Sequence, residues 1–311
     1  MRRFTAVFAL LVASVPCQTA FAKVLCSRHS GTVVIRDTCK PSETLLDPVA
    51  LGLQGPAGPP GPPGDPLGPC PADSVKVGNV CVDKYEASVW SIPAANTDLV
   101  DKVRHGTATL QDLNAGGATE LNTVSFSIGC TPPLFPATFL PNGNWTDPVY
   151  AVSIPSVLPS ACLTWFQAVQ ACAFSGKHLL TNEEWQRAAA GTPDPGADQT
   201  VGICTIFSDP TPTGSHPQCV SSWGAYDMAG NVYEWVADWT DRASQCTNWP
   251  SDYGDDVSCW GGSGTSGQIP GAVARGGYFG IGGGSYAGIF DVYALNPPSF
   301  EVEGVGFRCG R

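Results

Sequence analysis

The stretch GAYDMAGNVYEWVADW, residues 224–239, places carboxylates, glycine and small residues in one short turn. Side-chain and backbone oxygens alternate along this turn, and a hard cation such as Ca²⁺ prefers several oxygen ligands of both kinds. The pattern therefore predicts a calcium site with four ligands, two carboxylates and two carbonyls: Asp227, Glu234, Gly230 and Val232. The alternative is that both acids are ordinary surface residues that flank a buried Trp235.

Three other blocks accompany the turn: KHLLTNEEWQRAAAG at 177–191, ARGGYF at 274–279 and GVGFRC at 304–309. Together with the turn they resemble the formylglycine-generating enzyme (sulfatase-modifying factor) family over residues 76–311, most closely from residue 161 onward. The resemblance implies a loop-rich α+β fold like that of the C-type lectins, with two helices and small antiparallel sheets. It also implies that the turn binds calcium.

Active members of this family carry two cysteines, separated by four residues, just after the RGG block. Their thiolates bind Cu(I), a soft ion suited to sulfur, and the copper activates O₂ to oxidise a substrate cysteine. No cysteine stands between Cys259 and Cys309 in this chain. The resemblance therefore implies a pseudoenzyme without copper and without a catalytic residue. A related iron-dependent branch needs an H-x3-H-x-E cluster, and the four histidines are not spaced in that way.

The segment that lacks the thiols is rich in aromatic and small residues. Aromatic residues separated by small ones make a rigid contact surface at a low cost in conformational entropy. We therefore predict a ligand-binding surface that six residues form: Tyr278, Phe279, Tyr286, Phe290, Asp291 and Tyr293. The alternative is that these aromatic side chains simply pack in the core.

Twelve of the thirteen cysteines follow residue 22, an even number that suits disulfides in an oxidising compartment. Spacing suggests local pairs, although the sequence does not fix the connectivity: Cys26 with Cys39, Cys70 with Cys81, Cys204 with Cys219 and Cys246 with Cys259. The family resemblance implies a further bond between Cys172 and Cys309. Zinc is not expected, because C-x-x-C spacing is absent.

The first 22 residues are typical of a secretory signal peptide, with Arg2 and Arg3, an apolar run over 4–15 and an A-x-A cleavage site at 20–22. We therefore expect a protein that is secreted, displayed at the cell surface or held in the periplasm. No later stretch is long enough to span a bilayer. The net charge of −11 and the scattered Lys and Arg residues argue against nucleic-acid binding.

Three further segments follow the signal. Residues 23–51 form a small disulfide-linked piece with one expected strand within residues 30–39. Residues 52–69 are collagen-like, with Gly at positions 52, 55, 58, 61 and 64. Glycine at every third position is what a collagen triple helix requires, so this segment is either a stiff spacer or part of a homotrimeric stalk. Residues 70–311 form the sulfatase-modifying-factor-like domain.

Within that domain, apolar spacing predicts a helix over 162–173 that Gly176 ends. A capping box of Thr181 and Glu184 predicts the start of a second helix, which ends at Gly191. An alternating run over 78–90 predicts a strand, and we expect long loops with short strands over 92–160.

These observations favour a secreted, non-catalytic, calcium-stabilised module that binds a peptide, protein or glycan. The alternative is an oxidoreductase of the same family. It would be either a cysteine-independent oxidase or a formylglycine generator that acts on protein cysteines with displaced thiols.

Overall fold

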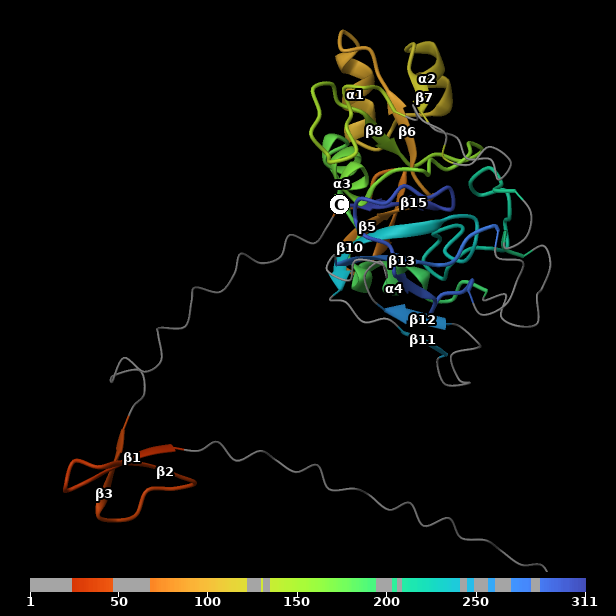
Figure 1. Ribbon diagram of the computed structural model, residues 1–311. Helices are drawn as coiled ribbons and strands as arrows, with labels where there is room; N and C mark the ends of the chain where they lie inside the picture. Colours follow the sequence, from red (N-terminus) through yellow and green to blue (C-terminus); the bar gives the residue numbers. More distant parts are fainter. Residues whose placement is uncertain are drawn as a thin grey trace, which may run out of the picture. The chain divides into compact units, whose positions relative to one another are not determined.

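The computed structural model describes the backbone and side chains of residues 24–46, 68–121, 130, 135–193, 203–205, 209–240, 270–280 and 286–311, and the backbone of 245–248 and 257–260. The chain divides into two compact units, residues 1–65 and 66–311 (Figure 1). The expected signal peptide and all five G-X-Y triplets lie outside the described residues.

The first unit contains a three-stranded antiparallel sheet in the order β2-β1-β3. Its strands are β1 (Val24–Arg28), β2 (Val33–Arg36) and β3 (Glu43–Leu46). The predicted disulfide between Cys26 and Cys39 fastens the loop between β2 and β3 to β1. The sequence indicated one strand here, within residues 30–39, and the structure adds β1 before it and β3 after it in the chain.

The second unit is built around a mixed six-stranded sheet in the order β11-β12-β14-β13-β10-β15. Two neighbouring pairs, β10 with β15 and β12 with β14, are parallel. The strands are β10 (Tyr233–Thr240), β11 (Gln245–Asn248), β12 (Val257–Trp260), β13 (Gly271–Arg275), β14 (Val292–Ala294) and β15 (Val305–Phe307).

Two smaller antiparallel sheets complete this unit, in the orders β4-β5-β16-β9 and β7-β6-β8. Their strands are β4 (Ser74–Val77), β5 (Val80–Asp83), β6 (Ser88–Ser91), β7 (Thr119–Leu121), β8 (Tyr150–Val152), β9 (His178–Leu179) and β16 (Cys309–Gly310). The alternating run over 78–90 therefore contributes two strands, β5 and β6, that belong to different sheets.

Four helices are present in the described part of the chain: α1 (Thr97–Arg104), α2 (Leu110–Ala115), α3 (Trp165–Phe174) and α4 (Asn182–Ala189). Helix α4 begins with the predicted capping box of Thr181 and Glu184. Helix α3 also begins with a capping box, at Thr164, so Cys162 lies before the helix and not within it. Helices α1 and α2 occupy a segment that the sequence indicated as loops.

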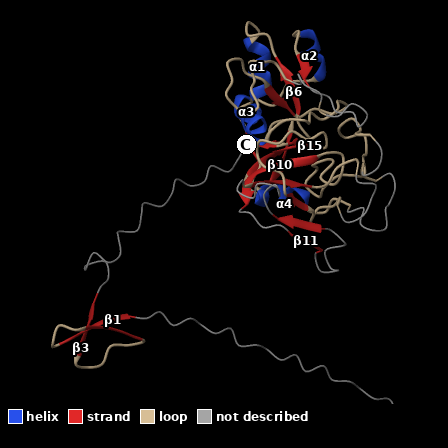
Figure 2. Cartoon of the chain, in the orientation of Figure 1, coloured by secondary structure: helices blue, strands red, loops and turns tan. Residues whose placement is uncertain are grey.

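Helices α3 and α4 pack on opposite faces of the central sheet, as the alternation of side chains along β10 requires (Figure 2). Trp235 shares one apolar cluster with Leu163 and with Cys172 of α3. Val236, the next residue, shares the other cluster with Trp185 of α4. This two-sided burial fixes the register of β10 and of the turn that precedes it.

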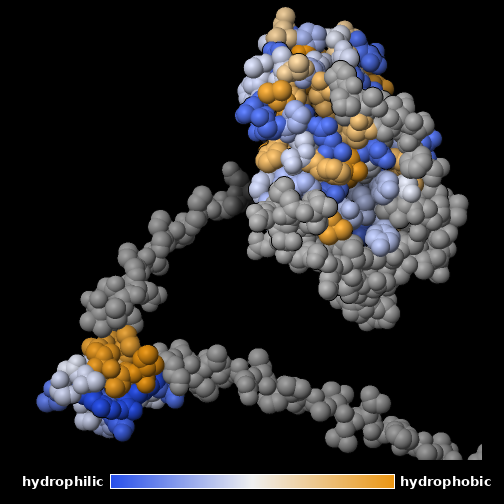
Figure 3. Space-filling model, in the orientation of Figure 1, coloured by the Kyte–Doolittle hydropathy of each residue, from blue (hydrophilic) through white to orange (hydrophobic). Residues whose placement is uncertain are grey.

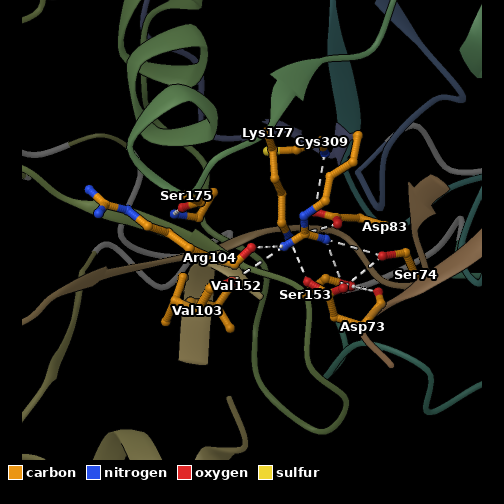
Figure 4. A network of polar contacts seen from close by, with 12 residues as sticks. Asp73, Ser74, Asp83, Val103, Arg104, Val152, Ser153, Ser175, Lys177 and Cys309 are labelled. Atoms are coloured by element: carbon orange, nitrogen blue, oxygen red, sulfur yellow. Dashed lines mark hydrogen bonds and ion pairs between the residues drawn. The ribbon is translucent and has the colours of Figure 1, made fainter. Parts of the chain in front are cut away.

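A buried ion network holds the C-terminal end against β4 and β5 (Figure 4). Lys177 Nζ, just after α3, lies 2.7 Å from Asp83 Oδ1 and 2.8 Å from Asp73 Oδ2. Arg311 Nη1 lies 2.9 Å from Asp73 Oδ1. Burial raises the pKa of Asp83 to about 6, although the Lys177 charge opposes that rise.

Disulfides join distant parts of the second unit. The predicted pairs Cys70–Cys81 and Cys204–Cys219 are present, as is Cys172–Cys309, which the family resemblance implied. The pair Cys130–Cys162 was not predicted, because 32 residues separate its members. The predicted pair Cys246–Cys259 lies outside the described side chains, although the backbone places the two residues opposite each other on β11 and β12. Within the described residues, none of the helices has the length and apolarity to cross a bilayer.

Candidate functional site

The turn before β10 contains three of the four predicted calcium ligands, Asp227, Gly230 and Val232, and the fourth, Glu234, is the second residue of β10. Asp227 and Asn231 have positive φ angles of 57° and 59°, a conformation that Asn and Asp tolerate better than other side chains. Asp227 Oδ2 accepts a hydrogen bond of 2.7 Å from the backbone N–H of Gly214. Both side chains are buried, so this turn belongs to the interior of the unit.

Glu234 is held by a buried arginine. Arg308 is fully buried, and its Nε lies 2.9 Å from Oε1 and 2.7 Å from Oε2 of Glu234. Trp185 Nε1 donates a further hydrogen bond of 2.7 Å to Oε2. The guanidinium of Arg308 therefore neutralises a carboxylate in the core and has no surface role.

A third acid, Glu86, completes this cluster. Glu86 is buried and accepts hydrogen bonds from Val232 N at 3.1 Å and from Asn231 Nδ2. Burial raises the pKa of Glu86 well above its usual value, and the charges of Asp227 and Glu234 raise it further. Burial also raises the pKa of Asp227 to about 6. We call Glu86, Asp227, Glu234 and Arg308 the acidic cluster.

Glu234 does not fit the role of a calcium ligand in this arrangement, because each of its carboxylate oxygens already accepts two N–H donors. No group of three or more His, Cys, Asp or Glu side chains within the described residues is arranged to hold a metal ion. Calcium binding by the other three predicted ligands, Asp227 and the carbonyl oxygens of Gly230 and Val232, remains a prediction that does not include Glu234.

A hollow of about 290 Å³ lies on the α3 side of the central sheet and is lined mainly by tyrosine. The lining residues are Tyr233, Tyr278, Tyr286, Tyr293, Asn296, Val302, Gly304 and Val305. We call this feature the tyrosine hollow. It lies between strands β10, β14 and β15 and the loop that follows the RGG block, which is where the sequence predicted a binding surface.

The rings of the tyrosine hollow are stacked against one another. Tyr233 lies 5.6 Å from Tyr278, centroid to centroid, with an interplanar angle of 27°, and 5.5 Å from Tyr293 at 36°. The hydroxyl of Tyr233 donates to the backbone oxygen of Tyr286 at 3.3 Å. Burial raises the pKa of Tyr233 well above its usual value, and the neighbouring Asp291 raises it further. The phenol of Tyr233 is therefore neutral at physiological pH.

Gly304 allows the close approach of one of these rings. A Cβ at position 304 would lie 2.3 Å from an atom of the Tyr278 ring, which is far inside van der Waals contact. Gly304 also accepts a backbone hydrogen bond of 2.8 Å from Tyr233 N. The glycine of the GVGFRC block thus sets the position of two rings of the hollow.

Three of the six predicted binding residues, Tyr278, Tyr286 and Tyr293, line the hollow. Phe279 is fully buried and packs with Ala161 and Val232. Asp291 is also buried, and its backbone oxygen accepts a hydrogen bond from Arg275. Phe290 is half-buried and is not among the lining residues.

Tyr233, Asn296 and Gly304 were not predicted as part of the hollow. Tyr233 lies inside the motif that supplies the predicted oxygen ligands. Because successive side chains of a strand point to opposite faces, Tyr233 faces the side of β10 opposite to Glu234. That alternation could have identified it. Asn296 and Gly304 carry no such signal.

Arg275 of the RGG block stabilises the fold through contacts with α4 and with the loop before β14. Its guanidinium lies 4.6 Å from the centroid of the Trp185 ring and donates to the backbone oxygens of Ile289 and Asp291 at 3.0 and 2.7 Å. Arg275 thus fixes the loop before β14, and with it the strand that carries Tyr293.

The two cysteines of β11 and β12 are near this strand in register. The backbone places Cys259 opposite Tyr293, and Cys246 opposite Cys259. The other ten cysteines after residue 22 form the five disulfides described above. Any thiol chemistry close to the hollow would therefore have to come from Cys246 and Cys259.

A second hollow, of about 630 Å³, lies between α1 and the segment before β8. Its lining includes Arg104, Asp101 and Asp147 and one aromatic residue, Tyr150. It contains none of the blocks that the sequence singled out.

Comparison with known proteins gives a family for this chain. Residues 140–311 match the family described as "Sulfatase-modifying factor enzyme 1-like domain". Hercynine oxygenase of Mycolicibacterium thermoresistibile is 31% identical over 121 residues, which cover 35% of this chain and 26% of that protein. Formylglycine-generating enzyme of Thermomonospora curvata is 26% identical over 270 residues, which cover 78% and 85%.

The chain spans about a quarter of the length of the first curated relatives it matches. Among solved structures, the Major Tropism Determinant U1 variant is similar with a TM-score of 0.40 and 15% identity, over 95% of this chain and 73% of that one.

The matched residues include the α4 block, the turn, the RGG block and the GFRC block, and they cover more than half of the chain. The helices and small sheets confirm the predicted loop-rich α+β class. This chain belongs to the sulfatase-modifying factor enzyme 1-like domain family.

Proposed function

We propose that this protein is a non-catalytic module that binds a ligand in the tyrosine hollow. The observation that carries the proposal is the position of the hollow. Four tyrosines line it, and two of them lie in the segment directly after the RGG block, where active members of the family carry their thiols. Function in this family resides in the site and not in the fold, so a changed site supports a changed function.

The lining of the hollow indicates the chemistry of the ligand. No charged side chain is among the lining residues, so a neutral group fits best. Tyrosine rings offer apolar faces together with hydroxyl groups, and the Asn296 amide adds a donor and an acceptor. A volume of about 290 Å³ is at the small end for ligand pockets. We therefore infer that the hollow takes one ring, either a sugar of a glycan or a proline or aromatic side chain of a peptide.

The disulfides indicate the compartment in which such a module would act. Five disulfides among the described residues suggest an oxidising environment outside the cytosol. We propose that the protein is exported and acts in the extracellular space, at the cell surface or in the periplasm.

Glycan and peptide arrays, followed by calorimetry of the hits, test the proposed binding. Tyr286 is 41% exposed at the edge of the hollow, and Trp223, which is 42% exposed, is not a lining residue. We expect Tyr286→Ala to weaken binding about fivefold or more, since a well-placed aromatic contact contributes about 1 kcal/mol or more. Trp223→Ala, the matched control, should bind like the wild type.

The absence of hits on both arrays would contradict the proposal. Equal affinities of the Tyr286→Ala variant and the wild type for every hit would also contradict it, because the ligand would then bind elsewhere.

A family oxidoreductase is the second candidate, and the register of Cys259 opposite Tyr293 favours it. In that case Cys246 and Cys259 would take the role of displaced copper-binding thiols. Thiol titration of the folded protein separates the two candidates. We expect no free thiol for the binding module, whereas two reactive thiols, with copper-dependent formation of an aldehyde on a cysteine-containing peptide, would establish the enzyme.

A further inference from the structure

The small sheet of the first unit exposes an apolar face. Cross-strand partners lie on the same face of an antiparallel sheet, and Leu25 of β1 pairs with both Ile35 of β2 and Leu46 of β3. These three aliphatic residues therefore form a row across all three strands, with Val33 beside it. Ile35 is 69% exposed and Val33 is 50% exposed.

The other face of the sheet has a different character. It carries the disulfide between Cys26 and Cys39 and an ion pair in which Arg36 Nε lies 2.9 Å from Glu43 Oε2. Figure 3 shows the apolar residues of this unit gathered on one side and the hydrophilic residues on the other. The unit is thus two-faced, and nothing within residues 24–46 covers its apolar side.

This sheet has too little interior to be stable by itself. Within residues 24–46, Cys26 is the one buried residue. Units of fewer than about 40 residues usually need disulfides, metals or oligomerisation to fold stably. One disulfide is present, and the exposed row of aliphatic side chains offers the surface for oligomerisation.

The glycine spacing that follows the sheet favours three as the number of chains. Glycine stands at every third position from Gly52 to Gly64, and only an assembly of three chains requires that spacing. Five triplets are too few to hold three chains together unaided, so another part of the chain has to bring the copies together. The small sheet directly precedes the triplets.

We propose that the face formed by Leu25, Val33, Ile35 and Leu46 is a trimerisation surface that packs against the same face of two further copies of this chain. Packing three copies around one axis buries the aliphatic row.

The mass of the purified full-length mature chain in solution, measured by light scattering after gel filtration, tests this proposal. We expect a mass three times that of the single chain. Ile35→Lys places a charge in the apolar row and should lower the mass about threefold, to that of a single chain. Leu45→Lys is the matched control, since Leu45 is 63% exposed on the opposite face of the same sheet, and this variant should remain a trimer.

A third variant, Gly58→Ala, tests whether the triplets or the sheet hold the chains together. We expect it to stay trimeric, because the sheet and not the triplet segment holds the chains together. A monomeric or dimeric wild type would overturn the proposal. A monomer would result, for example, if this face bound another part of the same chain. An Ile35→Lys variant that stays trimeric, a Leu45→Lys variant that dissociates equally, or a monomeric Gly58→Ala variant would also overturn it.

Discussion

The acidic cluster and the tyrosine hollow lie on opposite sides of β10, and neighbouring residues of this strand, Glu234 and Tyr233, belong to one each. Glu234 points into the acidic cluster, where Arg308 and Trp185 occupy its oxygens. Tyr233 points into the hollow, which has room for a ligand. The region with the most recognisable motif is closed and internally neutralised, whereas the region that departs from the family is open.

This difference separates the scaffold from the site. The motif residues Arg308 and Glu234 satisfy each other, and Arg275 fixes the loop before β14, so these side chains hold the fold of this chain. The loop after the RGG block carries the side chains that a ligand can reach. A change of function in this family can therefore leave the motifs intact.

Removal of the buried arginine should give the largest effect. Arg308→Met leaves Glu234 as an unpaired buried carboxylate, so we expect the free energy of unfolding to fall by about 3–5 kcal/mol. Tyr286→Ala, in the hollow, should change it by less than about 1 kcal/mol, because this side chain is partly exposed. Urea denaturation measures both values.

Adding Glu234→Gln to Arg308→Met should recover part of the lost stability, because the unpaired charge is then gone. Equal losses for Arg308→Met and Tyr286→Ala would remove the distinction between the two regions.

The pH dependence should give an intermediate effect. The folded-state pKa values of Asp83 and Asp227 are raised to about 6 from 3.8, so the folded state binds protons more tightly than the unfolded state. Stability from these groups is therefore gained as pH falls through 6 and is lost as pH rises through 6. Between pH 7 and pH 5 we expect a gain on the order of 1 kcal/mol per group.

Thermal unfolding at pH 7 and pH 5 measures this gain. Asp227→Asn removes one of the three buried carboxyl groups with a raised pKa and should reduce the gain without abolishing it, because Asp83 and Glu86 remain. A protein that is less stable at pH 5 than at pH 7 would show that the pKa values of these carboxyl groups are not raised in the fold.

Calcium removal should give the smallest effect. Because Glu234 is engaged by Arg308, any calcium in the turn would have only Asp227 and two carbonyl oxygens from this chain. We therefore expect a chelator to lower the melting temperature by less than about 2 °C, equivalent to less than 1 kcal/mol for a unit of this size. A larger fall that added calcium reverses would restore Glu234 as a ligand.

Local patterns in the sequence were enough to predict several elements. The Thr181 and Glu184 capping box predicted α4, and close spacing predicted three of the five disulfides among the described residues. These features depend on interactions between residues near one another in the chain. Helix α2 was missed, although Thr109 and Asp112 form a capping box there, because six residues are too few to show helical periodicity.

Long-range pairing accounts for what could not be predicted. Glu86 joins Asn231 across 145 residues, and Cys130 joins Cys162 through segments with no pattern. Phe279 and Tyr278 are adjacent aromatic residues, yet Phe279 is in the core and Tyr278 lines the hollow. Burial of that kind depends on which strands pack above the loop, and one-dimensional spacing does not contain this information.

Residue types alone established the family blocks, the missing cysteine pair and the glycine period of the N-terminal segment, because each is a matter of identity and spacing along the chain. The packing of the folded chain established that Arg308 occupies the predicted calcium ligand Glu234 and that Tyr233 faces a hollow. Both outcomes follow from the alternation of side chains on a strand that is buried on two sides, since neighbouring residues then enter different environments.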